Sequence, residues 1–359
     1  MARNIMKVKE TKDRYDVTYM AGDDSGFDMM EGALLVLDAM NLPINWHRAD
    51  LGWCMWEKSN KKFGEGDPRC NTVPPETIKS IRDTDATLMA AITSKAGVKG
   101  FKSAILQMRQ LFDLYINIRP AKKLPGIGTP LAKDPNIDIV MFRENTEDLY
   151  AGVEHMVGKD AAESIKIFTR EGCRRILRYA FEYAVKHNRR KVTAVHKANI
   201  MKCTDGMFLE EARAMAQQYP NIEFEDRIVD ALCMKLVQTP EIFDVLVLPN
   251  LYGDIVSDLC AGLVGGLGVA PGANLGEHEA VFEAIHGSVP HRAGTNTANP
   301  MALLLSGVMM LRHLGEEQAA QRVEDALVAV IGEGTHLPQD LGGKTGTQEF
   351  ADAIIEKLR

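Results

Sequence analysis

The sequence predicts an α/β protein built on a mostly parallel sheet. Segments typical of strands and of helices alternate along the chain, which is the pattern of a doubly wound fold. The first unit is a strand at residues 16–21, a glycine-containing turn at residues 22–26 and a helix at residues 27–40. The chain has 359 residues. Because single cores rarely grow past about 250–300 residues, we expect more than one lobe.

Later segments continue the alternation. An apolar run at residues 242–248 is typical of a buried strand, and a helix is predicted directly after it at residues 253–263. No G-x-G-x-x-G sequence is present, so the usual dinucleotide-binding crossover is not expected. The other predicted strands cover residues 86–92, 115–119, 137–142 and 191–196. The other predicted helices cover residues 74–83, 103–114, 169–187, 205–218, 300–314, 317–331 and 347–358.

Composition narrows the class of protein. Hydrophobic residues make up 45% of the chain and charged residues 25%, which excludes disorder. No apolar run reaches the roughly 18 residues of a membrane span, and the net charge of -7 comes without a large basic block. We therefore expect neither membrane nor nucleic acid as a partner. The six cysteines have no C-x-x-C spacing and the N-terminus has no apolar signal core, so a reduced, cytoplasmic location is expected.

Two acids follow the buried strand at residues 242–248. Asp254 and Asp258 are four residues apart, so on a helix they lie one turn apart on one face. Two isolated acids at this spacing are usually part of a solvated polar helix face. Here the surrounding sequence is nearly free of charge, which favours a site for a divalent cation such as Mg²⁺ or Mn²⁺. Asp230, flanked by apolar residues, is a third candidate ligand.

Five further side chains are candidates for binding and catalysis. Arg109, Arg119 and Arg143 each lie at or near the end of a predicted element, and three guanidinium forks can grip a di- or tricarboxylic acid. Singly, each arginine is expected to be a surface salt-bridge partner. Tyr150 can protonate a carbon if neighbouring cations shift its pKa, and Lys197, just past a predicted strand, can act as a base. Most lysines, however, are solvent-facing charges.

Longer blocks resemble the β-decarboxylating dehydrogenases, the family of isocitrate, 3-isopropylmalate, homoisocitrate and tartrate dehydrogenases. The resemblance runs from about residue 103 to the C-terminus and is weaker before it. Several blocks in the right order are far more specific than one motif. They are RQLFDLYINIRP, FRENTEDLYAGVEH, HKANIMK followed by TDG, LPNLYGDIVSDLCAGLVGGLGVAPGANLG, HGSVP with TANPMALLLSGVMMLRHLG, and DLGGKTGTQEFADAI.

The resemblance implies a two-domain fold. A large α/β domain that binds the cofactor would be made from both chain ends, at residues 1–114 and 265–359. A smaller central α/β domain for substrate and dimerisation would cover residues 115–147 and 170–264, with a clasp at residues 148–169. This fold would explain why the dinucleotide fingerprint is missing.

The resemblance also implies a role for each candidate residue. The substrate carboxylates would be bound by Ser103, Arg109, Arg119 and Arg143. Lys197 would take the hydroxyl proton and Tyr150 would protonate the enolate. The metal ligands would be Asp230, Asp254 and Asp258. Lys197 and Asp230 would reach into the partner's site, so the active unit would be a homodimer with shared sites.

Cofactor binding is implied for the loop at residues 286–299. Its candidate residues are His286, Gly287, His291, Arg292 and Asn299. NAD enzymes of the family carry Asp-Ile where this chain has His291-Arg292, a basic pair that favours the phosphate of NADP. NADP enzymes carry an arginine near Asp340, an acid that would repel that phosphate. NAD is the expected cofactor, with NADP left open.

Isocitrate is the expected substrate, in a reaction of the tricarboxylic acid cycle. Ser103 matches the serine that binds its γ-carboxylate, but Ile105 stands where isocitrate enzymes carry asparagine. The family's GDGIGPE turn is also altered here, at residues 22–28. Homoisocitrate, 3-isopropylmalate and tartrate therefore stay open as substrates, as does a regulatory paralogue that modulates a catalytic partner.

Overall fold

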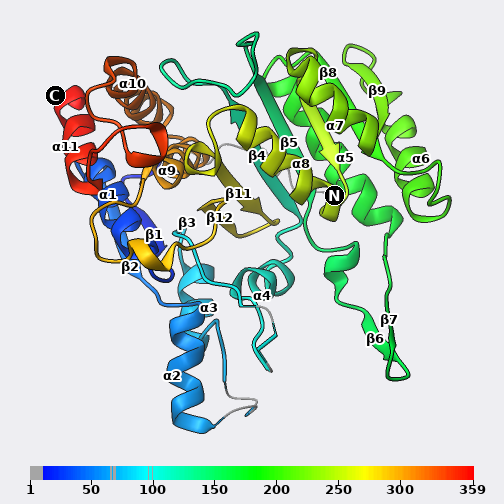
Figure 1. Ribbon diagram of the computed structural model, residues 1–359, viewed down its shortest axis with the longest axis horizontal. Coiled ribbons are helices and arrows are strands. Elements are labelled where there is room, and N and C mark those ends of the chain that lie inside the picture. Colours follow the sequence, from blue (N-terminus) through cyan, green and yellow to red (C-terminus); the bar gives the residue numbers. More distant parts are fainter. Residues whose placement is uncertain (1–10, 65–66, 68–69, 96, 99) are drawn as a thin grey trace.

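One ten-stranded sheet organises the chain (Figure 1). The computed structural model describes residues 11–64, 67, 70–95, 97, 98 and 100–359. The strand order is β2-β1-β3-β12-β11-β4-β5-β10-β8-β9. These strands are β1 (Tyr15–Met20), β2 (Ile44–Arg48), β3 (Ala86–Met89), β4 (Ile116–Lys122), β5 (Asp138–Glu144), β8 (Lys191–His196), β9 (Glu223–Ile228), β10 (Val245–Leu248), β11 (Pro271–Leu275) and β12 (Ala280–Ala284).

The sheet is parallel except at its centre. β11 runs antiparallel to both of its neighbours, and β4 pairs antiparallel with β5. All other neighbouring strands of this sheet are parallel. The prediction of a mostly parallel α/β sheet is therefore confirmed.

Helices cover the sheet in two groups (Figure 1). α1 (Gly26–Asp38) packs against α11 (Thr347–Leu358), so one lobe contains helices from the first forty and from the last fifteen residues of the chain. α9 (Met301–Leu314) and α10 (Glu317–Glu333) complete that lobe. The other lobe is formed by α5 (Arg170–Lys186), α6 (Thr204–Ala216), α7 (Val229–Gln238) and α8 (Asn250–Leu263). No described helix is long and apolar enough to cross a membrane.

Burial explains why these segments form core elements. All four residues of β10 are buried, as an apolar strand covered on both faces should be. Eleven of the fourteen residues of α9 are buried, which makes it the central helix of its lobe. β4 alternates between polar and apolar side chains. Asn117 and Arg119 face one side of the sheet, while Ile118 and Pro120 line a cavity on the other.

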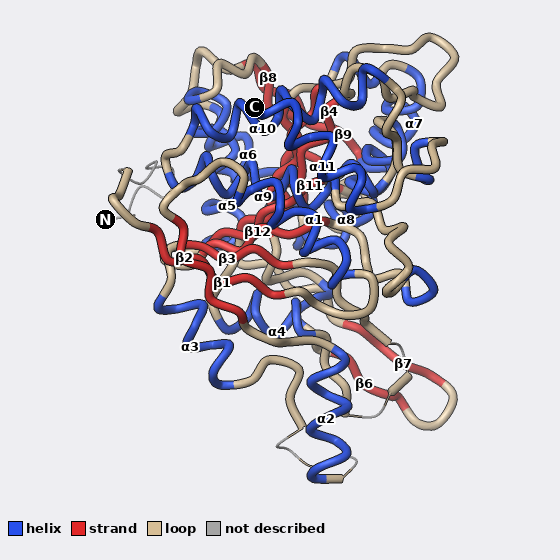
Figure 2. The backbone as a smooth tube through the Cα atoms, turned by 90° about the vertical axis from the view of Figure 1, so that its left-hand side faces the viewer, coloured by secondary structure: helices blue, strands red, loops and turns tan. Residues whose placement is uncertain are grey.

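Two elements project from the same side of the molecule (Figures 1 and 2). One is α2 (Trp53–Phe63), which follows β2, with α3 (Pro75–Asp83) and α4 (Ala104–Leu111) nearer the sheet. The other is a hairpin of β6 (Glu154–Val157) and β7 (Ala161–Ser164), whose residues are all exposed. This hairpin lies within the segment predicted to be a clasp.

Candidate active site

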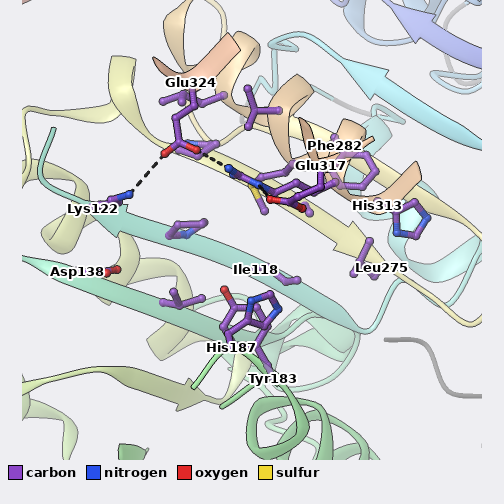
Figure 3. Close-up of a pocket in the computed structure, with 18 of the residues that line it drawn as sticks. Ile118, Lys122, Asp138, Tyr183, His187, Leu275, Phe282, His313, Glu317 and Glu324 are labelled. Atoms are coloured by element: carbon purple, nitrogen blue, oxygen red, sulfur yellow. Dashed lines mark hydrogen bonds and ion pairs between the residues drawn. The ribbon is translucent and has the colours of Figure 1, made fainter. Parts of the chain in front are cut away.

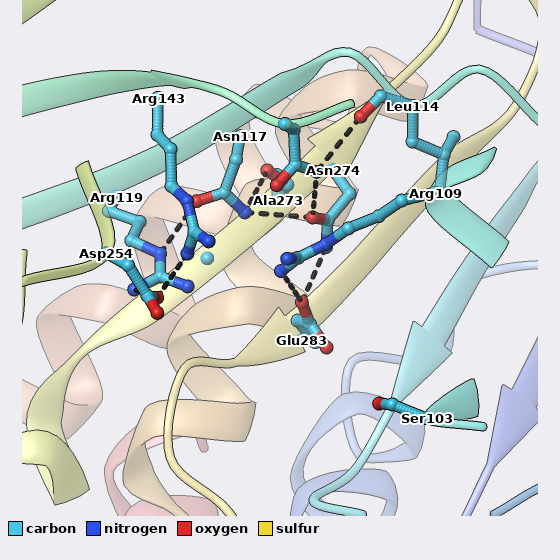
Figure 4. A network of polar contacts seen from close by, with 12 residues as sticks. Ser103, Arg109, Leu114, Asn117, Arg119, Arg143, Asp254, Ala273, Asn274 and Glu283 are labelled. Atoms are coloured by element: carbon cyan, nitrogen blue, oxygen red, sulfur yellow. Dashed lines mark hydrogen bonds and ion pairs between the residues drawn. The ribbon is translucent and has the colours of Figure 1, made fainter. Parts of the chain in front are cut away.

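Three buried arginines form the floor of the candidate site (Figure 4). Arg109 lies on α4, Arg119 on β4 and Arg143 on β5, and their exposed fractions are 5%, 5% and 1%. Arg143 pairs in strand register with Asn117, two residues from Arg119. Three consecutive elements, α4, β4 and β5, thus bring three cations together. The expectation that each arginine alone is a surface salt-bridge partner is wrong.

Helix α8 holds two of the arginines in place. Arg143 donates from Nε and Nη2 to Asn250 Oδ1, at 3.0 and 2.7 Å, and from Nη1 to Asp254. A Cβ on Gly253 would lie 2.5 Å from Arg143 Cγ, so only glycine lets the helix approach this closely. Arg119 Nη1 donates to Ser257 Oγ at 2.6 Å and lies 3.4 Å from Asp254 Oδ1.

A row of buried polar groups supports the arginines from below. Arg119 Nε donates to Asn117 Oδ1 at 2.7 Å, and Asn117 donates to Asn274 Oδ1 at 2.8 Å. Asn274 in turn donates to Glu283 Oε1 at 2.7 Å, and Glu283 lies 3.6 Å from Arg109 Nη2. The row links Arg119 to Arg109 and fixes the spacing between the two guanidinium groups (Figure 4).

The arginine cluster can bind an anion through its positive charge and an unpaired N–H donor. Burial and the neighbouring Arg143 lower the pKa of Arg109 to about 9, and the same two causes lower that of Arg119 to about 10. Both therefore remain cationic at neutral pH, and an added carboxylate would stabilise them. Arg109 Nε is buried and has no hydrogen-bond partner among the described residues. A buried donor of this kind is costly unless a ligand accepts from it.

Tyr150 joins this cluster from the segment after β5. Its Oη donates to Asp254 Oδ2 at 2.5 Å, and its ring centre lies 5.0 Å from the Arg143 guanidinium carbon. Burial raises the pKa of Tyr150, and the bond to Asp254 raises it further, which outweighs the nearby arginines. The neighbouring cations that we expected to govern the shift oppose it instead. The phenol is a proton donor at neutral pH.

The two acids on α8 lie on one face, as predicted, and contact the arginines. Arg119 Nη1 lies 3.6 Å from Asp258 Oδ1 as well as near Asp254. Burial acts to raise the pKa of Asp254, but Arg143 and Tyr150 outweigh it, so the pKa is lowered. Burial raises the pKa of Asp258. Asp254 is thus ionised through the neutral range.

Lys197 and the third acid lie apart from this pair. Lys197 Nζ donates to Asp230 Oδ1 at 2.6 Å, and this bond lowers the pKa of Asp230. The Lys197 backbone N–H donates to the buried Asp205 at 2.7 Å, which fixes its loop. Within the described part of a single chain, no three acids, histidines or cysteines are placed to hold a metal ion. The three predicted metal ligands are thus not grouped within the described part of one chain.

Ser103 also stands apart from the arginines (Figure 4). It is the residue before α4, and its hydroxyl lies 3.0 Å from that of Ser94. Ile105, two residues on, is half-buried and packs against a small core cluster beside α3 and α4. The polar contact expected at this position in isocitrate enzymes is absent from the side chain, as the sequence indicated.

The loop at residues 286–299, called the cofactor loop from here on, follows β12. His286 Nε2 is buried and has no partner among the described residues, while Nδ1 lies 3.0 Å from the Gly287 carbonyl oxygen. Arg292 Nη1 donates to the Thr297 carbonyl at 3.1 Å, and His291 is exposed. Asn299 donates to Asp340 Oδ2 at 3.0 Å. The predicted cofactor residues thus lie on one loop, where the buried ring nitrogen His286 Nε2 has no partner among the described residues.

Sequence reasoning missed the residues that hold this loop. Asp24 and Ser25, in the turn after β1, and Asp28, in the first turn of α1, each accept a hydrogen bond from it. It also missed Asn117, Asn250, Asn274, Ser257 and Glu283 beneath the arginines. The altered turn was visible in the sequence, but its contact with a loop about 265 residues away was not.

A cavity of about 620 Å³ lies on the opposite face of the same strands (Figure 3). Ile118 and Pro120 of β4 line it, whereas Arg119 between them faces the arginine cluster. Tyr183 stacks on His187 in its wall with ring centres 4.0 Å apart. None of the predicted site residues lines this cavity, so it is separate from the candidate site.

Comparison with known proteins relates the chain to one enzyme family. The profile of the family described as isocitrate/isopropylmalate dehydrogenase matches residues 16–354. A mitochondrial isocitrate dehydrogenase [NAD] catalytic subunit 5 from Arabidopsis thaliana is 44% identical over 95% of this chain and 88% of its own length. A 3-isopropylmalate dehydrogenase from Archaeoglobus fulgidus is 43% identical over 95% of this chain and 99% of its own.

A third relative and one solved structure complete the comparison. A mitochondrial regulatory subunit of isocitrate dehydrogenase [NAD] from Dictyostelium discoideum is 43% identical over 95% of this chain and 91% of its own. The crystal structure of isocitrate dehydrogenase from Methylococcus capsulatus matches with a TM-score of 0.89 and 44% identity, covering 96% of this chain and 99% of that one. The relatives thus differ in the substrate and role that their names give.

Proposed function

Because the chain belongs to the isocitrate/isopropylmalate dehydrogenase family, whose members are NAD-dependent decarboxylating dehydrogenases, we propose that it converts isocitrate to 2-oxoglutarate and CO₂ with reduction of NAD. The observation that carries the proposal is the cluster of Arg109, Arg119 and Arg143. Three buried guanidinium groups with an unpaired donor on Arg109 suit a substrate with several carboxylates.

The donor set beside the arginines fits a divalent cation. Asp254 and Asp258 offer hard carboxylate oxygens from one helix face, and Asp230 of a second copy would add a third. When bound, Mg²⁺ or Mn²⁺ supplies Lewis-acid polarisation of the substrate oxygens. In this proposal the arginines also orient the two carboxylates on α8, because Arg119 contacts both Asp254 and Asp258 and Arg143 contacts Asp254.

The cofactor loop fits NAD through its own free groups. His286 Nε2 is an orphaned buried polar atom, and a ligand that donates to it or accepts from it would satisfy it. Bound NAD supplies the acceptor for the hydride from the substrate's C2. Asp340, held by Asn299, places a carboxylate beside the loop and disfavours the additional phosphate of NADP.

Two side chains, Lys197 and Tyr150, transfer protons in the proposed reaction. Lys197 takes the hydroxyl proton as the C2 hydride leaves, which yields a β-keto acid, and Asp230 stabilises the resulting ammonium at 2.6 Å. The carbon–carboxylate bond then breaks and CO₂ leaves. Tyr150 delivers its phenolic proton to the carbon, and the raised pKa of Tyr150 keeps that proton available at neutral pH.

We propose that the active unit is a homodimer in which Lys197 and Asp230 serve the partner's site. Exposed apolar side chains on the two helices beside them support a second copy at this face. Met234 and Val237 lie on α7 and Ile255 on α8, and all three are more than half exposed. A cytoplasmic location is part of the same proposal.

A second candidate substrate rests on one side chain. Ile105 is half-buried and apolar where isocitrate enzymes carry asparagine, which favours a 2-hydroxy acid with a less polar substituent, such as 3-isopropylmalate. Homoisocitrate and tartrate are further alternatives. One relative is named as a regulatory subunit, which supports a third candidate, a paralogue that modulates a catalytic partner. Against it, the proposed catalytic groups Tyr150 and Lys197 are both present.

Initial rates of the purified chain separate these candidates. Isocitrate, homoisocitrate, 3-isopropylmalate and tartrate are each tested with NAD and with NADP in the presence of Mn²⁺. We expect NADH production from isocitrate. Turnover of another acid alone would assign the substrate pocket to that acid, and turnover of none would leave the regulatory paralogue.

A further inference from the structure

The turn after β1 and the first turn of α1 contact the cofactor loop through three side chains. Ser288 Oγ donates to Asp24 Oδ2 at 3.0 Å, and the Val289 backbone N–H donates to Ser25 Oγ at 3.0 Å. The Gly294 backbone N–H donates to Asp28 Oδ2 at 2.8 Å. A stretch of five residues thus binds three points along the loop.

Asp24 joins this turn to two other segments of the chain. Its Oδ2 also accepts from Thr93 Oγ1 at 2.7 Å, and the Thr93 and Ser288 hydroxyls contact each other. One half-buried carboxylate oxygen therefore connects the turn, the segment after β3 and the cofactor loop. Both of these donors to the Asp24 carboxylate are hydroxyl groups, those of Thr93 and Ser288.

The backbone at Asp24 has an unusual conformation that its neighbour stabilises. Its φ is 50°, in the left-handed region where the family's GDGIGPE turn has glycine. The adjacent, buried Asp23 accepts from the backbone N–H groups of Trp53 and Thr93, both at 2.9 Å. These bonds fix the turn, so the Asp24 side chain is held toward the loop. An acid here carries a conformational cost that glycine would not.

We propose that Asp24 is a positioning residue that sets the cofactor loop in its binding conformation before the cofactor arrives. A loop that is already ordered loses less conformational freedom on binding, and the cofactor therefore binds more tightly. The inference deepens the proposed function and rests on it, since it assigns the loop to NAD. The proposal explains why this chain has aspartate where the family turn has glycine. The carboxylate increases the affinity for the cofactor, and this gain offsets the conformational cost of an acid at a positive φ.

Substitution of Asp24 by glycine tests the proposal, because glycine suits the left-handed backbone and removes the carboxylate that contacts the loop. We expect Asp24→Gly to raise the KM for NAD roughly tenfold, the effect of one lost charge-assisted hydrogen bond. The KM for isocitrate and the melting temperature should stay at the wild-type values. Asp24→Asn keeps an acceptor and tolerates a positive φ, so it should recover part of the affinity.

Hydrogen exchange of the cofactor-free chain gives a readout that does not require activity. Amides at residues 286–289 should exchange faster in Asp24→Gly than in the wild type. Asn41→Gly is the matched control, since Asn41 has a φ of 52° and is exposed after α1. Unchanged exchange and an unchanged KM for NAD in Asp24→Gly would overturn the proposal, as would an equal rise in both KM values. The proposed function fails separately. If the wild type reduces neither NAD nor NADP while the variant still shows faster loop exchange, the contact orders the loop but the assigned activity is wrong.

Discussion

The phenolic oxygen of Tyr150 lies 2.5 Å from Oδ2 of Asp254 and donates a hydrogen bond to it. Asp254 in turn accepts from Arg143, so one carboxylate links the proposed acid to the arginine cluster. This bond and burial together raise the pKa of Tyr150. The carboxylate therefore both orients the phenol and keeps it protonated.

Removal of the phenolic hydroxyl should abolish most of the turnover. We expect Tyr150→Phe to lower kcat by about 10²–10⁴-fold, the usual contribution of a positioned proton donor. The KM for isocitrate should change little, because the arginines remain. Steady-state rates with isocitrate, NAD and Mn²⁺ measure both. Tyr183→Phe, whose ring lines the cavity on the other face of the sheet, is the control and should keep full activity (Figure 3). A Tyr150→Phe enzyme with wild-type kcat would remove Tyr150 from the mechanism.

Loss of one arginine should weaken substrate binding strongly. Arg119→Gln removes a buried cation whose charge-assisted hydrogen bonds to a substrate carboxylate contribute about 1.5–3 kcal/mol each. We expect kcat/KM for isocitrate to fall roughly a hundredfold. Arg189→Gln is the matched control, since Arg189 pairs with Asp138 and Asp244 on the far face. Equal losses in the two variants would mean that the effect is general destabilisation and would remove Arg119 from the site.

A complementation experiment tests which chain Lys197 serves. Lys197→Ala and Tyr150→Phe should each be inactive alone. If Lys197 acts in the partner's site, a mixed dimer has one site with both defects and one intact site. Random mixing of the two variants should then restore roughly a quarter of the wild-type activity. If Lys197 acts in the site of its own chain, every site keeps one defect and the mixture stays inactive. The rates of the mixed and unmixed samples, after reassociation, distinguish the two arrangements.

The fold was predictable where apolar periodicity is strong. The helices at α5, α8, α9, α10 and α11 and the strands at β1, β8 and β10 were all anticipated. β11 and β12 near the centre of the sheet, and the hairpin strands β6 and β7, were not predicted. β2 and β9 were missed too, and they are the two outer strands of the sheet. Their sequences, INWHR and EFEDRI, face water on one edge and so lack the apolar run of a central strand. α2 was missed because it projects from the sheet and has a single buried residue.

The site was predictable to the level of single reactive groups. Arginines, acids, the tyrosine and the lysine stand out by residue type and by the element that precedes them. The residues that hydrogen-bond to them do not stand out. Asn117, Asn274 and Glu283 come into contact only because β4, β11 and β12 are neighbours in the sheet. A buried asparagine carries no local signal of its partner. The separation of Asp230 from Asp254 within one chain also requires the fold.

The ion pairs between α5 and α6 predict an acid-dependent loss of stability. Glu211 on α6 accepts from Arg170 at 2.6 Å and from Arg174 at 2.7 Å, and only 8% of its side chain is exposed. The hydrogen bond from Arg174 lowers its pKa below the ordinary value of 4.5. The unfolded chain therefore binds a proton at a higher pH than the folded chain does. The stabilising effect is present above pH 4.5 and is lost as the pH falls through the lower, folded value.

Glu211→Gln keeps the shape of the side chain and removes its charge. At pH 7 the free energy of unfolding should fall by about 1 kcal/mol, a small value because both arginines are nearly half exposed and solvent screens the pairs. The difference from the wild type should vanish below the folded pKa of Glu211. Urea unfolding at pH 7 and at successively lower pH measures it. Glu210→Gln is the control, since Glu210 is mostly exposed and meets Arg170 at 3.0 Å, so its loss should have little effect. A Glu211→Gln deficit of the same size at every pH would show that packing, and not the charge, links the two helices.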